Sequence, residues 1–117
     1  HSKNELETFQ YYFDSGNFCY KVNDLNRALD YYEKCLQIYS FNYPSNKNSA
    51  YLANNLMNIG LVLLKKRDYN RALQNFEKSY KIKMNISGDY LNNYYNIASS
   101  LNNIGLAYYY TSDNEKS

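Results

Sequence analysis

Apolar side chains recur along most of the chain at intervals of three and four residues, the spacing of a helix that buries one face. One clear series runs through Leu25, Ala28 and Tyr32, and Asp24 and Asp68 stand where a helix N-cap is expected. The chain holds only 4 Gly and 1 Pro, too few for the many tight turns of a β-sandwich or barrel. The pattern therefore predicts an all-α protein with helices over residues 4–21, 24–40, 48–66, 68–85 and 91–111.

The helical pattern also repeats along the chain. A shift of 60 − 16 = 44 residues places Gly16 on Gly60 and the run Asn26-Arg27-Ala28-Leu29 on Asn70-Arg71-Ala72-Leu73. A further shift of 105 − 60 = 45 residues places Gly60 on Gly105. Such a period is typical of solenoids in which stacked helix pairs cover one another's apolar faces. Turn-forming residues at 42–46 and 87–89 would separate the units.

Each predicted unit has a glycine inside its first helix, where glycine costs roughly 1 kcal/mol relative to alanine. Gly16 is followed twelve residues later by Ala28, and Gly60 by Ala72. We interpret each pair as a close approach of two helices, with a small residue facing a small residue. The predicted repeat-core signature is Gly16, Ala28, Gly60, Ala72 and Gly105.

These residues resemble the tetratricopeptide repeat, and residues 98–108 are similar in particular to the longer repeat of kinesin light chains. The resemblance implies a right-handed solenoid of antiparallel helix pairs that binds another protein and does not catalyse a reaction. It implies about two and a half units, over residues 4–41, 48–86 and a truncated 91–117, and we expect the chain to be a piece of a longer protein. The matching residues are Tyr12, Ser15, Gly16, Cys19, Ala28, Tyr32 and Cys35, then Leu56, Ile59, Gly60, Leu63, Ala72, Phe76 and Ser79, then Leu101, Ile104, Gly105 and Tyr108.

The composition leaves little room for an active site. The only histidine is His1, so neither a Ser-His-Asp triad nor a Cys-His pair can be assembled. Gly88 is the only glycine in a linker, which excludes a glycine-rich phosphate loop, and no spacing fits a zinc site. With 13 basic and 11 acidic residues, the net charge of +2 does not favour nucleic acid or an anionic membrane. We expect no enzyme activity, no cofactor and no metal.

Cys19 and Cys35 are the only cysteines, and neither belongs to a CxxC motif. A secreted domain of this size more often carries several disulfides. We therefore expect both thiols to be reduced, in the core of an intracellular, cytoplasmic protein.

The partner-binding surface of such an array would be its concave face, lined by the first helix of each unit. Side-chain amides can pair with the backbone of an extended peptide, and methionine and aromatic rings supply adaptable apolar contact. Asn58 and Asn103 stand two residues before a glycine in successive units and form a possible ladder, whereas packing is the preferred interpretation for Leu61 and Leu106. The predicted partner-binding residues are Asn17, Asn54, Met57, Asn58, Leu61, Lys65, Asn102, Asn103 and Tyr109.

Two more specific binding functions find little support. Phe13, Ser99 and Asn103 occupy the places where repeats that bind chaperone tails carry basic residues, so a terminal carboxylate would have few cations to dock on. RNA-binding helical repeats read bases with side chains at fixed positions, and no such code is visible in this sequence. We expect a solvated outer surface from the basic residues Lys65, Lys66, Arg67, Arg71, Lys78, Lys81 and Lys83.

The C-terminal part of the sequence suggests an alternative function. Leu101, Ile104, Ala107 and Tyr108 should face the second helix of their own unit, of which 113–117 would be only the start. An open apolar stripe of that length usually recruits a partner. The alternative to peptide binding is therefore association of two copies through residues 101–110.

Overall fold

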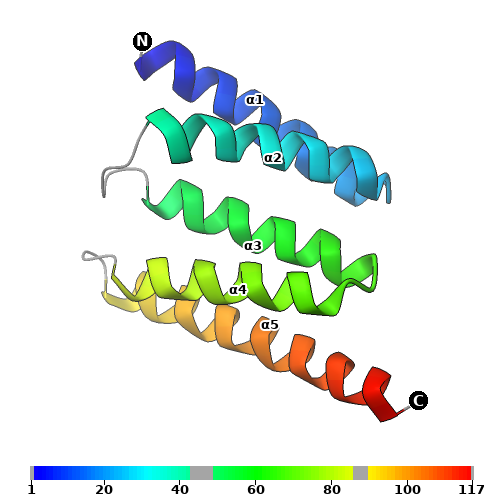
Figure 1. Ribbon diagram of the computed structural model, residues 1–117. Coiled ribbons are helices and arrows are strands. Elements are labelled where there is room, and N and C mark those ends of the chain that lie inside the picture. Colours follow the sequence, from blue (N-terminus) through cyan, green and yellow to red (C-terminus); the bar gives the residue numbers. More distant parts are fainter. Residues whose placement is uncertain (1, 43–48, 86–89, 117) are drawn as a thin grey trace.

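The structure, a computed structural model, describes residues 2–42, 49–85 and 90–116, and the predicted linkers fall almost entirely outside these ranges. Each helix packs against its neighbours in the chain. Figure 1 shows the stack growing in chain order, so that the two termini lie at opposite ends of a body measuring 50 × 33 × 22 Å. Over the described residues the chain is helical apart from short turns, as predicted. The helices are α1 (Ser2–Lys21), α2 (Leu25–Asn42), α3 (Ser49–Lys65), α4 (Tyr69–Met84) and α5 (Tyr90–Lys116).

These bounds agree with the predicted helices to within two residues, except at the end of α5. The predicted start of a sixth helix at 113–117 is wrong, because α5 continues without a break to Lys116. The helix pairs α1–α2 and α3–α4 each pack together, and they are called unit one and unit two below. Residues 113–116 extend α5, and helix propagation adds one backbone hydrogen bond per residue.

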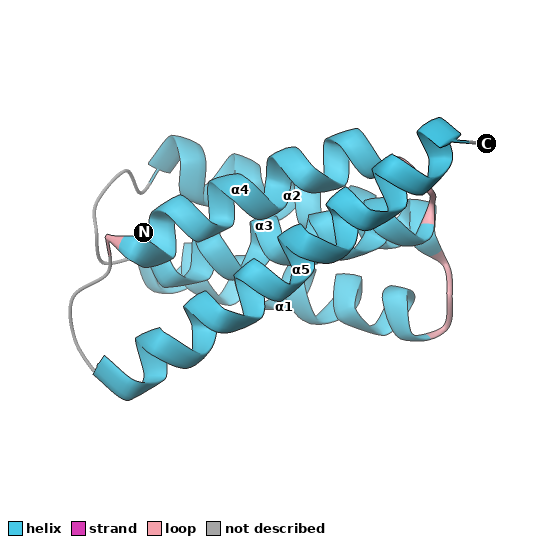
Figure 2. Cartoon of the chain, turned by 90° about the horizontal axis from the view of Figure 1, so that it is seen from below, coloured by secondary structure: helices cyan, strands magenta, loops and turns pink. Residues whose placement is uncertain are grey.

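The same turn closes both units, and Figures 1 and 2 place the two turns on the same side of the stack. Asn23 and Arg67 both adopt φ 66°, in the left-handed region. In unit one the Asp24 amide donates to the Cys19 carbonyl at 2.8 Å, and the Asn23 amide to the Tyr20 carbonyl at 3.0 Å. This pair of bonds is the Schellman motif that closes a helix C-terminus. The equivalent bonds in unit two run from Asp68 to Leu63 at 2.9 Å and from Arg67 to Leu64 at 3.1 Å.

Both second helices begin at an aspartate. The Asp68 carboxylate accepts from the Arg71 amide at 3.4 Å, which confirms the predicted N-cap of α4. At Asp24 the backbone carbonyl accepts the first helical bond, from the Ala28 amide at 3.0 Å. Each carboxylate also pairs with the arginine three residues later, Arg27 at 3.8 Å and Arg71 at 3.4 Å.

The side chain nearest each glycine is an aromatic ring rather than the alanine predicted to face it. Gly16, Ala28, Gly60 and Ala72 are all buried. A Cβ added to Gly60 would lie only 2.4 Å from Cε1 of the Phe76 ring, which is itself 1% exposed. The alanines are buried as predicted, but the ring one helical turn after each of them packs directly on the glycine.

In unit one the ring belongs to Tyr32, and a Cβ added to Gly16 would lie 2.7 Å from it. Gly105 differs, since a Cβ there would meet nothing within 4 Å. The glycine of a first helix is therefore required only where a second helix brings a ring against it.

The core joins the helices through a chain of apolar side chains and through side-chain hydrogen bonds to backbone carbonyls, among them one from Asn55 to Tyr32 at 2.9 Å. Cys19 and Cys35 are buried and free, and burial raises the pKa of the Cys35 thiol to about 12. The Cys35 thiol donates to the carbonyl of Phe9 at 3.6 Å, and the Ser79 hydroxyl donates to that of Ala53 at 2.7 Å. The main core cluster is Cys19, Ala28, Tyr32, Ile59, Val62, Leu63, Ala72, Phe76 and Ala107, and a second one is Phe9, Cys35 and Tyr39.

Candidate partner-binding groove

A cavity of about 580 Å³ opens between α1 and α3, and we call it the α1–α3 groove. Four of the predicted partner-binding residues come together there: Asn17, Asn58, Leu61 and Lys65. They share it with residues of α1 and with one side chain from α2, so three helices build it. The complete lining is Asn17, Phe18, Tyr20, Lys21, Tyr32, Asn58, Leu61 and Lys65.

A polar cluster of Asn17, Tyr32 and Asn58 joins the three helices of the groove. The Tyr32 hydroxyl donates to Oδ1 of Asn17 at 2.5 Å, and Nδ2 of Asn58 donates to the same oxygen at 3.1 Å. Burial raises the pKa of the Tyr32 phenol well above its usual value, so the hydroxyl stays a donor at neutral pH. The two bonds fix which end of the Asn17 amide is its acceptor.

The remaining polar atoms of the asparagine pair are free to bind something else. Neither Nδ2 of Asn17 nor Oδ1 of Asn58 bonds to a described residue, and neither is a fully buried unsatisfied atom. A side-chain amide has two donor hydrogens and two acceptor lone pairs. The pair therefore offers a donor on α1 next to an acceptor on α3, in a fixed orientation.

Aromatic and aliphatic side chains form the other walls of the groove. Nζ of Lys65 lies 4.2 Å from the centroid of the Tyr20 ring, a cation–π contact that joins α3 to α1. Leu61 is half-buried and packs on the core as well as lining the groove, which agrees with its predicted packing role. Phe18 is 65% exposed.

The structure does not bring the other predicted residues into the groove. Asn54 is exposed on α3, and Met57 is half-buried with its sulfur 4.0 Å from Nζ of Lys83. Asn102 and Tyr109 are exposed on α5, where Tyr109 packs edge-on against a neighbouring tyrosine. These residues lie on α3 and α5, but of the first helices only α1 and the C-terminal half of α3 line the groove.

The predicted asparagine ladder is uneven. Asn58 bonds to Asn17, whereas Asn103 is half-buried and forms no hydrogen bond with a described residue. The reason is the residue that would face it, because a shift of 61 − 17 = 44 places Leu61 where unit one has Asn17. Leucine cannot accept a hydrogen bond, so the second step of the ladder has no polar partner.

Beyond the ladder, the space between α3 and α5 holds a smaller cavity of about 300 Å³. The rings of Tyr69 and Tyr110 stack there with centroids 5.3 Å apart. Leu106, predicted to be a packing residue, lines this cavity and is 40% exposed.

Tyr32 is buried at a core position of unit one, yet it also lines the groove. The signal for its second role is a tyrosine where unit two has Phe76. Lys83 was expected on a solvated surface and is 2% exposed. It lies four residues after Ser79 and seven after Phe76, so helical periodicity places it on the buried face of α4.

The predicted stripe on α5 is partly wrong. Leu101 and Tyr108 are 50% and 54% exposed, as expected of an uncovered face, but Ala107 is fully buried in the core. An α-helix turns by about 100° per residue, so Tyr108 returns to the side of Leu101 while Ala107 points away from it. Ile104 is half-buried against the same core.

No three His, Cys, Asp or Glu side chains among the described residues gather in a way that could hold a metal ion. None of the helices, over the described ranges, combines the length and apolar character of a membrane span.

Comparison with known protein families finds a match. The family model described as tetratricopeptide repeat matches residues 7–85, a range that contains unit one, unit two and the whole α1–α3 groove. No curated protein and no solved structure matches the chain.

Proposed function

Because the chain belongs to the tetratricopeptide repeat family, whose members generally act as protein-interaction modules without catalytic activity, we propose that it binds an extended peptide segment of a partner protein. The proposed site is the α1–α3 groove on the concave face of the array. The observation that carries the proposal is the free donor of Asn17 beside the free acceptor of Asn58.

An extended peptide presents backbone carbonyl and amide groups in alternation. The Asn17 amide can donate to one such carbonyl and the Asn58 oxygen can accept from a nearby amide. Because both side chains are already held in place, little conformational entropy is lost when a peptide binds. A cavity of about 580 Å³ lies within the usual range of ligand sites, and Phe18 and Leu61 supply apolar contact.

The test is selection of binders from a random nine-residue peptide library displayed on phage, followed by calorimetry with the selected peptides. We expect Asn17→Ala and Asn58→Ala each to weaken binding by about fivefold or more, since a ligand group is left unpaired. Asn70→Ala on α4, where the residue is exposed and outside the groove, is the matched control. Peptides that bind all four proteins equally would place the site elsewhere.

The remaining predicted residues belong to an extension of the same proposal. Asn54, Met57, Asn102, Asn103 and Tyr109 would contact a partner longer than the groove. We expect their alanine variants to weaken a whole partner protein more than a selected nine-residue peptide. Equal losses for both ligands would contradict the extension.

A second candidate function is self-association through α5. The observation that favours it is the exposure of Leu101 and Tyr108, whose equivalents Leu56 and Leu63 are 7% and 1% exposed beneath α4. Two copies could cover these side chains in a symmetric contact. Sedimentation equilibrium should then show a concentration-dependent dimer for the wild-type chain but not for Leu101→Gln/Tyr108→Gln. A wild-type monomer at high concentration would exclude this function.

We also propose a repeat subtype and a cellular location for the chain. Residues 98–108 support the longer, kinesin-light-chain-like repeat, which an experimental structure of the helix packing around α5 would test. The free thiols Cys19 and Cys35 support an intracellular, cytoplasmic location, which imaging of the tagged protein would test.

A further inference from the structure

The α1–α3 groove carries positive charge and no negative charge. Lys21 and Lys65 line it, and none of its lining residues is acidic. The two lysines are the last residues of α1 and α3, on the side of the stack where both turns lie (Figure 1). Their spacing of 65 − 21 = 44 residues equals the repeat, so they hold equivalent places in the two units.

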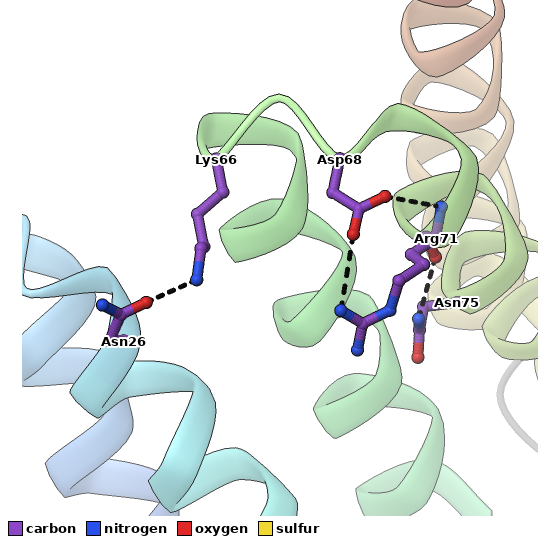
Figure 3. Close-up of polar contacts among 5 residues, drawn as sticks. All are labelled: Asn26, Lys66, Asp68, Arg71 and Asn75. Atoms are coloured by element: carbon purple, nitrogen blue, oxygen red, sulfur yellow. Dashed lines mark hydrogen bonds and ion pairs between the residues drawn. The ribbon is translucent and has the colours of Figure 1, made fainter.

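The nearest acidic residues in the sequence are already paired. Asp24 lies 3.8 Å from the Arg27 guanidinium. Asp68 binds both the amide and the guanidinium of Arg71, and Figure 3 shows its carboxylate turned toward that residue. Neither Lys21 nor Lys65 forms an ion pair with any described residue. The arginines thus occupy the local carboxylates and leave the lysines without an acidic partner.

Lys65 is also distinguished from the lysine that follows it. Lys66 donates to Oδ1 of Asn26 and thereby ties unit two to unit one, as Figure 3 shows. Lys65 instead holds its ammonium over the Tyr20 ring, at the junction of α1 and α3. A cation–π contact leaves the ammonium hydrogens free to donate to an anion. Tyr20 therefore positions a cation beside the groove without neutralising it.

A simpler interpretation is that both lysines only stabilise their helix ends. The C-terminus of a helix carries partial negative charge, and a lysine in the last turn is favourable there. In α3, however, Lys66 and Arg67 already follow the helix end, and Lys65 points across to the neighbouring α1. The helix-end role does not account for that contact between units.

We propose that the α1–α3 groove selects peptides carrying an aspartate or glutamate, whose carboxylate is bound between Lys21 and Lys65. This inference rests on the proposed function, in which Asn17 and Asn58 bind the peptide backbone. The two parts give the bound peptide a direction, because the acidic side chain lies toward the turns of the stack. The partner is thus an acidic segment rather than any extended peptide.

The experiment compares two synthetic pools of nine-residue peptides that differ only at the central position, which is Glu in one pool and Gln in the other. The other positions are drawn from the same mixture of Ala, Leu, Tyr, Ser, Asn and Gly. The proteins tested are the wild-type chain, Lys21→Gln/Lys65→Gln, and Lys78→Gln as a control, since Lys78 is exposed on α4 outside the groove. Circular dichroism confirms that each variant is folded, and a Leu61→Trp variant, whose uncharged ring fills the groove, gives the background.

We expect the wild-type chain to retain the Glu pool about fivefold better than the Gln pool, as is reasonable for partly exposed ion pairs. The preference should weaken as salt is raised, vanish in Lys21→Gln/Lys65→Gln and persist in Lys78→Gln. Equal retention of both pools above background would overturn the acidic preference and leave the proposed function standing. Retention of neither pool above background would overturn both, and a preference that survives the double substitution would show that other residues select the acid.

Discussion

Unit one and unit two make the same contacts near their turns and different ones at the opposite end. There, Tyr39 of unit one lies in an aromatic cluster, with ring centroids 4.2 Å from Phe9 and 5.6 Å from Tyr51. A shift of 44 residues replaces Tyr39 by Lys83 and Phe9 by Ala53. Unit two therefore has a buried lysine where unit one has a buried ring.

The difference separates what the repeat requires from what it tolerates. Both units keep the glycine under a ring and the side-chain bond to the backbone of the first helix, from Cys35 in one and from Ser79 in the other. These contacts set the distance between the paired helices. Packing beyond them can change, even to Lys83, whose ammonium has no acidic partner among the described residues. Burying a cation without an acidic partner costs stability, so the end of unit two opposite its turn should be the weak point of that unit.

The largest expected effect concerns a contact that the two units share. Gly60→Leu should lower the free energy of unfolding by about 3 kcal/mol or more, because the Phe76 ring is buried and cannot move aside cheaply. Gly105 provides a matched position, since nothing lies within 4 Å of a Cβ there. Urea unfolding should show that alanine destabilises at position 60 and stabilises by roughly 1 kcal/mol at position 105. Alanine effects of the same sign at both positions would contradict the role given to the ring.

Replacing the buried Lys83 tests whether it makes unit two less stable than unit one. Lys83→Met keeps a long side chain and removes the charge, so it should stabilise the protein at pH 7 by on the order of 1–2 kcal/mol. Lys81→Met, at an exposed position on the same helix, is the control and should change little. A destabilised Lys83→Met protein would mean that the ammonium contributes favourably where it lies.

The pH dependence of the free energy of unfolding gives a second comparison of the wild-type chain with Lys83→Met. Burial lowers the pKa of Lys83 below its usual value of 10.5, so in the window between the two values the unfolded chain binds more protons than the folded one. The cost of burial is therefore fully present below the folded pKa and is relieved as pH rises toward 10.5. The advantage of Lys83→Met over the wild-type chain should shrink over that rise. An advantage that does not change up to that pH would contradict the lowered pKa.

A smaller effect distinguishes the two steps of the asparagine ladder. Asn58→Ala removes the bond to Asn17 and should cost about 1 kcal/mol of stability. Asn103→Ala removes no bond to a described residue and should be neutral or slightly stabilising, since alanine favours helix. Thermal unfolding of the two variants measures the difference. Equal melting temperatures would show that the Asn17–Asn58 bond contributes nothing to the fold.

Sequence reasoning found the helices and their pairing because these depend on local periodicity and on the 44-residue repeat. The sequence did not predict the rings on the glycines, since an offset of twelve residues links Gly60 to Ala72, whereas the atoms nearest to a Cβ at Gly60 belong to Phe76. Ala72 and Phe76 lie one turn apart on α4. The distance between the axes of α3 and α4 decides which of them meets Gly60. Lys83 differs from its predicted exposure for another reason, because its charge favours a solvated position while helical periodicity places it on the buried face of α4.

The groove could be predicted only in part. The sequence identified Asn17 and Asn58 as members of one surface, but not the bond between them. Their separation of 58 − 17 = 41 residues differs from the repeat, because neighbouring first helices pack with an offset along their axes. The hydroxyl of Tyr32, which comes from a second helix, could not be placed without that offset.

The smallest expected effect compares the two turns. Asn23 and Arg67 share φ 66°, a conformation that costs about 1 kcal/mol or more for most residues, less for asparagine and nothing for glycine. Arg67→Gly should therefore stabilise the protein by about 0.5 kcal/mol after the greater entropy of the unfolded glycine chain is deducted. Asn23→Gly should gain less, because asparagine already tolerates this conformation. Urea unfolding of the two variants decides the order: if Asn23→Gly gains more than Arg67→Gly, the Arg67 side chain stabilises its turn by contacts that outweigh the backbone strain.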